Sequence, residues 1–128
     1  MNWDDYPNFS IEEMRCKETF ECDMNPEFMT ILQSIRDVYS RPMIISSGYR
    51  SPLHSKEIIK PVKGEHTKGL AVDVAVYGSH ALDLIGISLS HGIGRIGVSQ
   101  KGTHSQRFLH LGMGDLEHKE FLPGVWSY

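Results

Sequence analysis

Three side chains of types that bind metal ions stand within or next to predicted strands: His66, Asp73 and His110. Two neutral imidazoles and one carboxylate, with a fourth position open to water, form a common catalytic zinc set. His66 and Asp73 are too far apart in sequence to share one face of a helix at positions i and i+4. We therefore expect the chain to fold His66 back over the strand that carries Asp73, and Gly69 and Ala71 leave room for that close approach.

Asp73 is the strongest of these three signals because it interrupts an otherwise apolar run, residues 70–77. An unpaired buried carboxylate is costly, so a cation or an arginine must lie beside it. A histidine taken alone is more often exposed, or held by an ordinary hydrogen bond, than bound to a metal. The donor set suits zinc first, although other divalent ions also accept two imidazoles and a carboxylate.

Two helices are predicted before the first strand. Ser10 as N-cap, with two glutamates in the first turn, predicts a short helix over residues 10–17. In residues 26–39 apolar side chains recur at intervals of three and four, which predicts a helix with one buried face. Asn25 as its cap and Pro26 at its first position mark where this helix begins.

Strands and one further helix follow. Residues 49–68 mix Ser, Pro, Gly, Lys and His without a period, so we expect a long, ordered surface loop there. The predicted strands are residues 43–47, 70–77, 93–98 and 108–113; the predicted helix is 79–91, with Ser79 as N-cap and Ala81, Leu82, Ile85 and Leu89 facing inward. Helices first, then strands with one inserted helix, indicate an α+β fold with a small, mostly antiparallel sheet.

Size and composition limit the class of protein. The chain has 128 residues, 40% of them apolar, which fits one domain spanning residues 1–128. A formal charge of −3 lacks the basic excess of a nucleic-acid binder. We see neither a membrane span nor a signal peptide, so we expect synthesis in the cytoplasm. Cys16 and Cys22 could form a disulfide or stay reduced, and a reducing compartment favours free thiols.

Three blocks of sequence occur in order: Ser-Gly-Tyr-Arg-Ser at 47–51, His-x-x-Gly-x-Ala-x-Asp at 66–73 and Phe-Leu-His-Leu at 108–111. Together they resemble the D-alanyl-D-alanine carboxypeptidase-like zinc peptidases, which share a fold with the zinc domain of hedgehog signalling proteins. With the N-terminal helices, the resemblance covers most of the chain. It implies the hedgehog/DD-peptidase-like fold and zinc-dependent hydrolysis of an amide bond in peptidoglycan stem peptides.

The resemblance also implies roles for individual residues. His66, Asp73 and His110 would hold Zn²⁺, and Arg50 would bind a carboxylate or carbonyl of the stem peptide. A guanidinium suits this role because its fork can hold a carboxylate bidentately. Judged by type alone, an arginine at the start of a loop is more often a surface charge or part of a structural ion pair.

A general base must take a proton from the attacking water. Members of the family commonly place an acid or a histidine two or three residues before the last ligand, where this chain has Phe108 and Arg107. We expect His104, in the predicted polar turn at 99–106, to be the catalytic base instead. Glu65 and Asp115 are the other candidates.

Two further departures from the family pattern are glycines. Gly64 stands where the family often has a serine, two residues before the first histidine ligand, and Gly112 stands where an aspartate often follows the last one. The first would remove a hydrogen bond to substrate. The second would remove a carboxylate that orients a ligand histidine.

These observations predict a monomeric zinc metallopeptidase, either a D-Ala-D-Ala carboxypeptidase or an endopeptidase, whose partner is a peptidoglycan stem peptide. It resembles the small endolysins of bacteriophages, which act on the cell wall after release. The alternative is a catalytically weak or inactive zinc-binding protein that recognises a cell-wall peptide or a protein partner. The aromatic residues 123–128 are expected to pack against the sheet, with glycan contact as the alternative.

Overall fold

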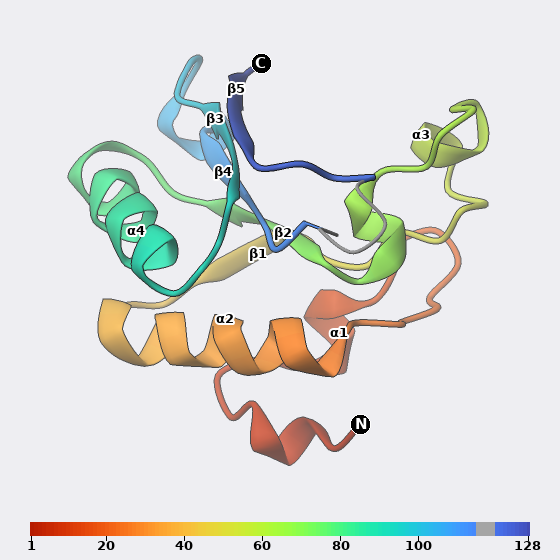
Figure 1. The fold of residues 1–128 in the computed structure, drawn as a ribbon, viewed down its shortest axis with the longest axis horizontal. Helices are drawn as coiled ribbons and strands as arrows, with labels where there is room; N and C mark the ends of the chain where they lie inside the picture. The colour runs from red at the N-terminus through yellow and green to blue at the C-terminus, as the bar shows by residue number, and fades with distance from the viewer. Residues whose placement is uncertain (115–119) are drawn as a thin grey trace.

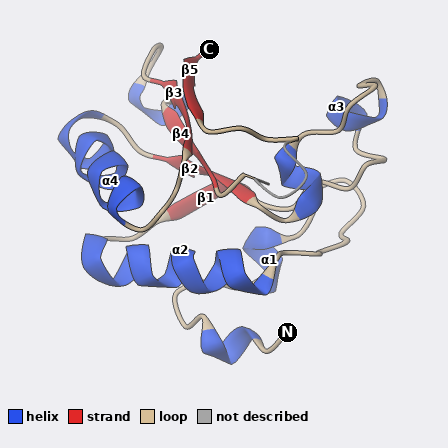
Figure 2. Ribbon diagram, viewed as in Figure 1, coloured by secondary structure: helices blue, strands red, loops and turns tan. Residues whose placement is uncertain are grey.

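The computed structural model describes residues 1–114 and 120–128. Within these ranges, helices come first and a five-stranded sheet follows, with α-helices inserted between β1 and β2 and between β2 and β3 (Figures 1 and 2). The elements are η1 (Trp3–Asp5), α1 (Ile11–Met14), α2 (Pro26–Tyr39), β1 (Ile44–Ser47), α3 (Ser55–Ile58), η2 (Glu65–Lys68), β2 (Ala71–Ala75), α4 (Gly78–Ser90), β3 (Arg95–Ser99), η3 (His104–Gln106), β4 (Phe108–Gly112) and β5 (Gly124–Ser127), where η marks a 3-10 helix.

The strand order in the sheet is β1-β2-β4-β3-β5. The pairs β1 with β2, β2 with β4, and β3 with β4 are antiparallel, and β5 pairs parallel to β3. The predicted α+β fold with a small, mostly antiparallel sheet is therefore confirmed. The sequence analysis did not predict β5 as a strand: the C-terminal aromatic segment extends the sheet.

One face of the sheet carries the hydrophobic core. Val72 and Val74 of β2, with Leu109 of β4, point to this face, because alternate residues of a strand share a side. They join the buried sides of α2 and α4, which lie below and to the left of the sheet in Figure 1. Since the residues between them point the other way, Asp73 and His110 lie on the opposite face.

Two of the three predicted N-caps, Asn25 and Ser10, are confirmed. The Asn25 side chain accepts a hydrogen bond from the backbone N–H of Phe28, and α2 runs from Pro26 with the predicted bounds. The Ser10 side chain likewise accepts from the N–H of Glu13. The helix it starts is shorter than predicted, because α1 ends at Met14.

Two local predictions were wrong. Residues 49–68 are not one irregular loop, since they contain α3 and η2. Helix α4 begins at Gly78 with Tyr77 as its N-cap residue, two residues earlier than the predicted cap at Ser79.

The predicted inner face of α4 was right for Ala81, which is buried, and Ile85, which packs partly buried against the core, and wrong for the other two residues. Leu82 and Leu89 are 70% and 56% exposed, whereas Ala81, Leu84 and Ser88 are buried. Apolar residues occupy several sides of this helix, so its periodicity does not single out one face. The choice is made by packing against α2 and β4.

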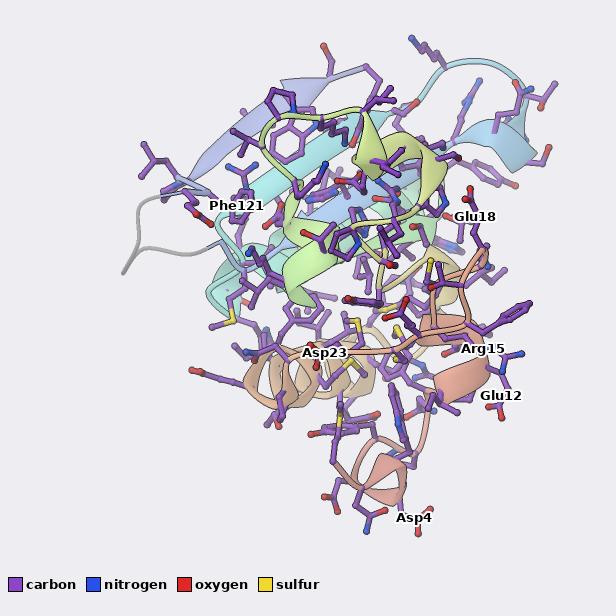
Figure 3. All side chains as sticks on the ribbon, turned by 90° about the vertical axis from the view of Figure 1, so that its right-hand side faces the viewer. Asp4, Glu12, Arg15, Glu18, Asp23 and Phe121 are labelled. Atoms are coloured by element: carbon purple, nitrogen blue, oxygen red, sulfur yellow. The ribbon has the colours of Figure 1, made fainter. Side chains whose placement is uncertain are left out.

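The N-terminal 3-10 helix η1 lies below α2 and away from the sheet, whereas α1 contacts β1 (Figure 1). Figure 3 shows Asp4 of η1 and Glu12 of α1 toward one end of the molecule and Phe121 beside the sheet. Cys16 and Cys22 are free thiols. Among the described residues, no helix is long and apolar enough to span a membrane.

Candidate metal centre and active-site cleft

A row of residues crosses the open face of the sheet at one level. The strand register places Ser47 beside Asp73, Asp73 beside His110, His110 beside Gly97, and Gly97 beside Trp126. Residues directly opposite on neighbouring antiparallel strands have Cβ atoms about 5 Å apart. The strand order therefore brings Asp73 and His110 into contact although they are far apart in sequence.

The 3-10 helix η2 carries His66 to this row. It ends at Gly69, whose φ of 68° lies in the left-handed region that favours glycine. A Cβ at Gly69 would also lie 2.7 Å from the backbone nitrogen of Asn25. The close approach of this turn to the chain before α2 therefore requires glycine. His66 Nδ1 lies 2.8 Å from the carbonyl oxygen of Gly48, and as the donor of this hydrogen bond it leaves Nε2 to face Asp73.

Two of the three distances between candidate ligand atoms match a tetrahedral zinc site, and all three atoms lie within 4.8 Å of one another. Asp73 Oδ1 lies 3.3 Å from His66 Nε2 and 3.2 Å from His110 Nδ1. Zinc bonds to nitrogen and oxygen near 2.1 Å place tetrahedral ligand atoms about 3.4 Å apart. Asp73 Oδ1 is buried and has no hydrogen-bond partner in the described part of the chain. The donor types, their spacing and this unsatisfied oxygen fit a zinc ion.

The charges around Asp73 keep it ionised. Burial raises the pKa of Asp73, but His110 and His66 outweigh burial and hold this pKa below its ordinary value. Burial lowers the pKa of His110, whereas Asp73 and Glu65 raise it above its ordinary value. Arg50 Nη2 adds a positive charge 3.7 Å from Asp73 Oδ2. Asp73 is therefore a carboxylate at neutral pH, the form that ligates a cation.

Arg50 lines the cleft and also holds its wall together. Its Nη1 donates to Glu57 Oε2 at 3.1 Å, and its Nη2 donates to Ser47 Oγ at 3.3 Å. Glu57 is fully buried and also accepts from Lys60 Nζ and from the backbone N–H of Gly64. Arg50 therefore fits both interpretations of its sequence position. It forms a structural ion pair with Glu57, and it is a cation beside the candidate metal ligands.

A cleft of about 420 Å³ lies over the candidate ligand atoms. Its lining includes four cationic side chains, two of them from the segment around α3, and four aromatic rings, two of them from β5 and its end. The cations are Arg50, Lys56, Lys60 and Arg95, and the rings are Phe108, Phe121, Trp126 and Tyr128. Such a lining suits an anionic ligand that also has apolar parts.

Gly97 allows the aromatic side of the cleft to form. A Cβ at Gly97 would lie 2.7 Å from the Trp126 indole and 2.9 Å from Tyr128 Oη. Without that atom the indole lies across β3, and its ring centroid is 5.0 Å from the ring of His110. Tyr128 in turn packs on Phe108 with ring centroids 5.0 Å apart. The C-terminal segment therefore joins the sheet as β5 and lines the cleft as well.

The structure does not bring His104 to this group. Its ring stacks on Tyr77 with centroids 4.1 Å apart, and both line a separate cavity with Arg41 and His80. At a strand rise of about 3.3 Å per residue, Tyr77 lies about 13 Å along the chain from Asp73. A direct role for His104 at the candidate ligands would require the turn around η3 to move.

The other two candidate bases differ in what can be said of them. Asp115 lies outside the described residues. Glu65 lines the cleft, and its Oε1 accepts hydrogen bonds from His110 Nε2 and Arg95 Nε, the latter at 2.9 Å. Glu65 Oε2 is buried and has no hydrogen-bond partner among the residues that the structure describes.

Sequence reasoning missed the cations other than Arg50 and the aromatic side of the cleft. The run of lysines near α3 was visible but was assigned to a surface loop. The sequence analysis placed the C-terminal aromatic residues against the sheet, with glycan contact as the alternative; that Trp126 lines the cleft depends on β5 pairing with β3.

The chain is an α+β domain that carries a His, Asp and His group at the floor of a cleft, and this combination is typical of a metal-dependent hydrolase. Residues 7–112 match the model of the family described as Peptidase M15, and the chain belongs to this D-Ala-D-Ala carboxypeptidase-like family. Peptidases of the M15 family are metallopeptidases that use zinc. No curated protein matches the chain. The matched range includes the three candidate ligands and Arg50 but ends before β5.

Proposed function

We propose that this protein hydrolyses an amide bond in the stem peptides of bacterial peptidoglycan. One observation carries the proposal: three candidate ligand atoms that lie within 4.8 Å of one another are at the floor of a cleft that a peptide could enter. Family membership supports the metallopeptidase activity. In the cell, we propose that the protein acts on the wall after release, as endolysins do.

His66, Asp73 and His110 would hold the zinc ion. When bound, zinc would supply a Lewis acid that polarises a carbonyl. It would also lower the pKa of water, so that the deprotonated form is available as the nucleophile near neutral pH. The buried floor of the site keeps the ligands in place, since His66 is tied to Gly48 and Asp73 is flanked by both imidazoles.

The cations of the cleft support an anionic peptide as substrate. Arg50 lines the cleft and has more N–H donors than Glu57 and Ser47 occupy, and Lys56 lines the same cleft. Stem peptides carry free carboxylates, which such cations recognise. We propose that Arg50 binds the carboxylate nearest the scissile bond.

Digestion of purified peptidoglycan by the zinc-loaded protein, followed by mass spectrometry of the fragments, tests this proposal. We expect new amine termini that do not form with His66→Ala, and fragment masses that identify the bond. Intact peptidoglycan together with one zinc bound per chain would contradict the peptidase proposal. It would favour the zinc-binding protein without hydrolysis.

Synthetic stem peptides with a free or an amidated C-terminus separate the two kinds of peptidase. A carboxypeptidase that uses Arg50 on the terminal carboxylate should lose most of its kcat/KM on the amidated peptide. An endopeptidase should cleave both at similar rates. The Arg50→Lys variant, which cannot form a bidentate fork, is the matched control.

A further inference from the structure

Glu65 occupies a space that the sequence leaves open at Gly112. The register places Gly112 between Ala71 and Arg95, in the row next to that of His110 and on the same face of the sheet. A Cβ at Gly112 would lie 2.5 Å from Cδ of Glu65, so any side chain there would displace this carboxylate. The position of the Glu65 carboxylate therefore depends on glycine at position 112.

The carboxylate of Glu65 is held from the far side by Arg95. Arg95 Nε donates to Glu65 Oε1 at 2.9 Å, and the Arg95 side chain is itself fixed by a hydrogen bond to the carbonyl oxygen of Leu122. Its guanidinium also lies over the Trp126 ring, 5.0 Å from the centroid. Glu65 is only 3% exposed, so its position is set by these contacts and not by solvent.

His110 is contacted through both of its ring nitrogens. Nδ1 faces Asp73 Oδ1 at 3.2 Å, and Nε2 contacts Glu65 Oε1. If Nε2 carries the proton that Glu65 accepts, Nδ1 presents its lone pair to the metal position. A carboxylate on the outer nitrogen of a ligand histidine fixes the tautomer and the ring orientation, and it makes the ligand more basic.

We propose that Glu65 is the positioning residue for His110, and that it supplies from η2 the carboxylate that Gly112 cannot supply from β4. This inference rests on the metal centre of the proposed function. It assigns Glu65 to the ligand histidine rather than to the attacking water, since the carboxylate is engaged by His110 Nε2 and Arg95.

Zinc affinity, measured by competition with a chromogenic chelator, tests the assignment. We expect Glu65→Ala and Gly112→Ala each to weaken zinc binding by about 10- to 100-fold, because both remove the carboxylate from His110. The double variant Glu65→Ala with Gly112→Asp places a carboxylate beside Arg95 again, and we expect it to recover most of the affinity. Glu65→Ala with Gly112→Ala fills the same space without a charge and should stay weak.

A control variant, a spectroscopic measurement and a substitute variant separate the outcomes. Glu27→Ala removes an exposed glutamate of α2 and should bind zinc as the unaltered protein does. The visible spectrum of the Co²⁺-substituted protein should change with Glu65→Ala and return with the Gly112→Asp double variant. If Glu65→Ala does not fold, Gly112→Ala carries the same test, since it keeps Glu65 but displaces it.

Unchanged zinc affinity of Glu65→Ala would overturn the inference. If that variant also lost hydrolysis, Glu65 would be the general base instead. Failure of the unaltered protein to bind zinc would overturn the proposed function and this inference with it, so the two failures are distinguished by which protein fails.

Discussion

At the residue scale, Asp73 is the side chain on which the metal centre depends most. It lies between two imidazoles and beside Arg50, and its Oδ1 lacks a hydrogen-bond partner in the described part of the chain. We expect Asp73→Asn to weaken zinc binding by more than about 100-fold, since loss of a supporting group alone costs 10- to 100-fold. Zinc content after gel filtration measures this. Stoichiometric zinc in Asp73→Asn would contradict the assigned ligand set.

His104 gives the second prediction at this scale. Its ring lies on Tyr77 and outside the cleft, so we expect His104→Ala to change kcat by less than about twofold. Loss of a general base would lower the rate by about 100- to 10,000-fold. Steady-state kinetics at unchanged zinc content decide between the two. A large fall would show that the turn around η3 moves during turnover, as the sequence-based role for His104 requires.

At the element scale, Glu57 anchors the segment around α3 beside the cleft. Burial raises the pKa of Glu57, but Lys60, the N–H of Gly64 and Arg50 outweigh burial and lower it from 4.5 to about 2. The charged form is therefore favoured on folding. Its contribution to stability is complete above pH 4.5 and is lost as the pH falls from 4.5 towards 2.

We expect Glu57→Gln to lower the free energy of unfolding by up to about 3 kcal/mol at pH 7, from about 1.4 kcal/mol per pKa unit. The difference between variant and unaltered protein should shrink as the pH falls to 3. Urea unfolding at both pH values measures this difference, with Glu27→Gln, at an exposed position of α2, as the control. An equal difference at pH 7 and pH 3 would show that the charge of Glu57 is not what stabilises the segment.

Strand β5 gives the second prediction at this scale. Because a Cβ at Gly97 would overlap the Trp126 indole, Gly97→Ala should displace that ring from the cleft. We expect KM for the stem peptide to rise several-fold, with a smaller loss of zinc affinity because Arg95 lies over the Trp126 ring. Gly86→Ala is the matched control, since a Cβ at Gly86 meets nothing within 4 Å. A normal KM in Gly97→Ala would mean that the aromatic side of the cleft does not contact substrate.

At the scale of the whole molecule, the two faces of the sheet have separate tasks. The core between the sheet, α2 and α4 is apolar. The opposite face carries the positively and negatively charged side chains that line the cleft, and without a bound cation these charges attract and repel one another directly. The fold should therefore survive removal of zinc, with lower stability. Binding to the folded state alone adds about 2.7 kcal/mol at a zinc concentration of 100 times Kd.

Thermal unfolding with and without a chelator measures this effect. We expect Tm to fall by roughly 10 °C on zinc removal, at a few degrees per kcal/mol for a domain of this size. His66→Ala should have the same Tm with and without zinc. A zinc-dependent Tm in that variant would indicate a second metal site.

How much could be predicted from the sequence differs between elements. The cap at Asn25 and the apolar spacing of residues 26–39 sufficed for α2, because both signals are local. Helix α4 has apolar residues on several sides, so its buried face required knowledge of its neighbours. The segment 49–68 lacks any period, and its short helices depend on side-chain contacts such as those of Glu57.

The sequence by itself determined the ligand types, the family pattern and the glycine that lets η2 cross close to the chain before α2. Only the tertiary structure decided that Glu65 fills the space at Gly112, that Trp126 lies over Gly97, and that His104 lies apart from the cleft. The physical reason is that strand order and register are long-range properties. A residue's type and its neighbours in sequence indicate which chemistry it can do, whereas the pairing of distant strands decides which residues meet.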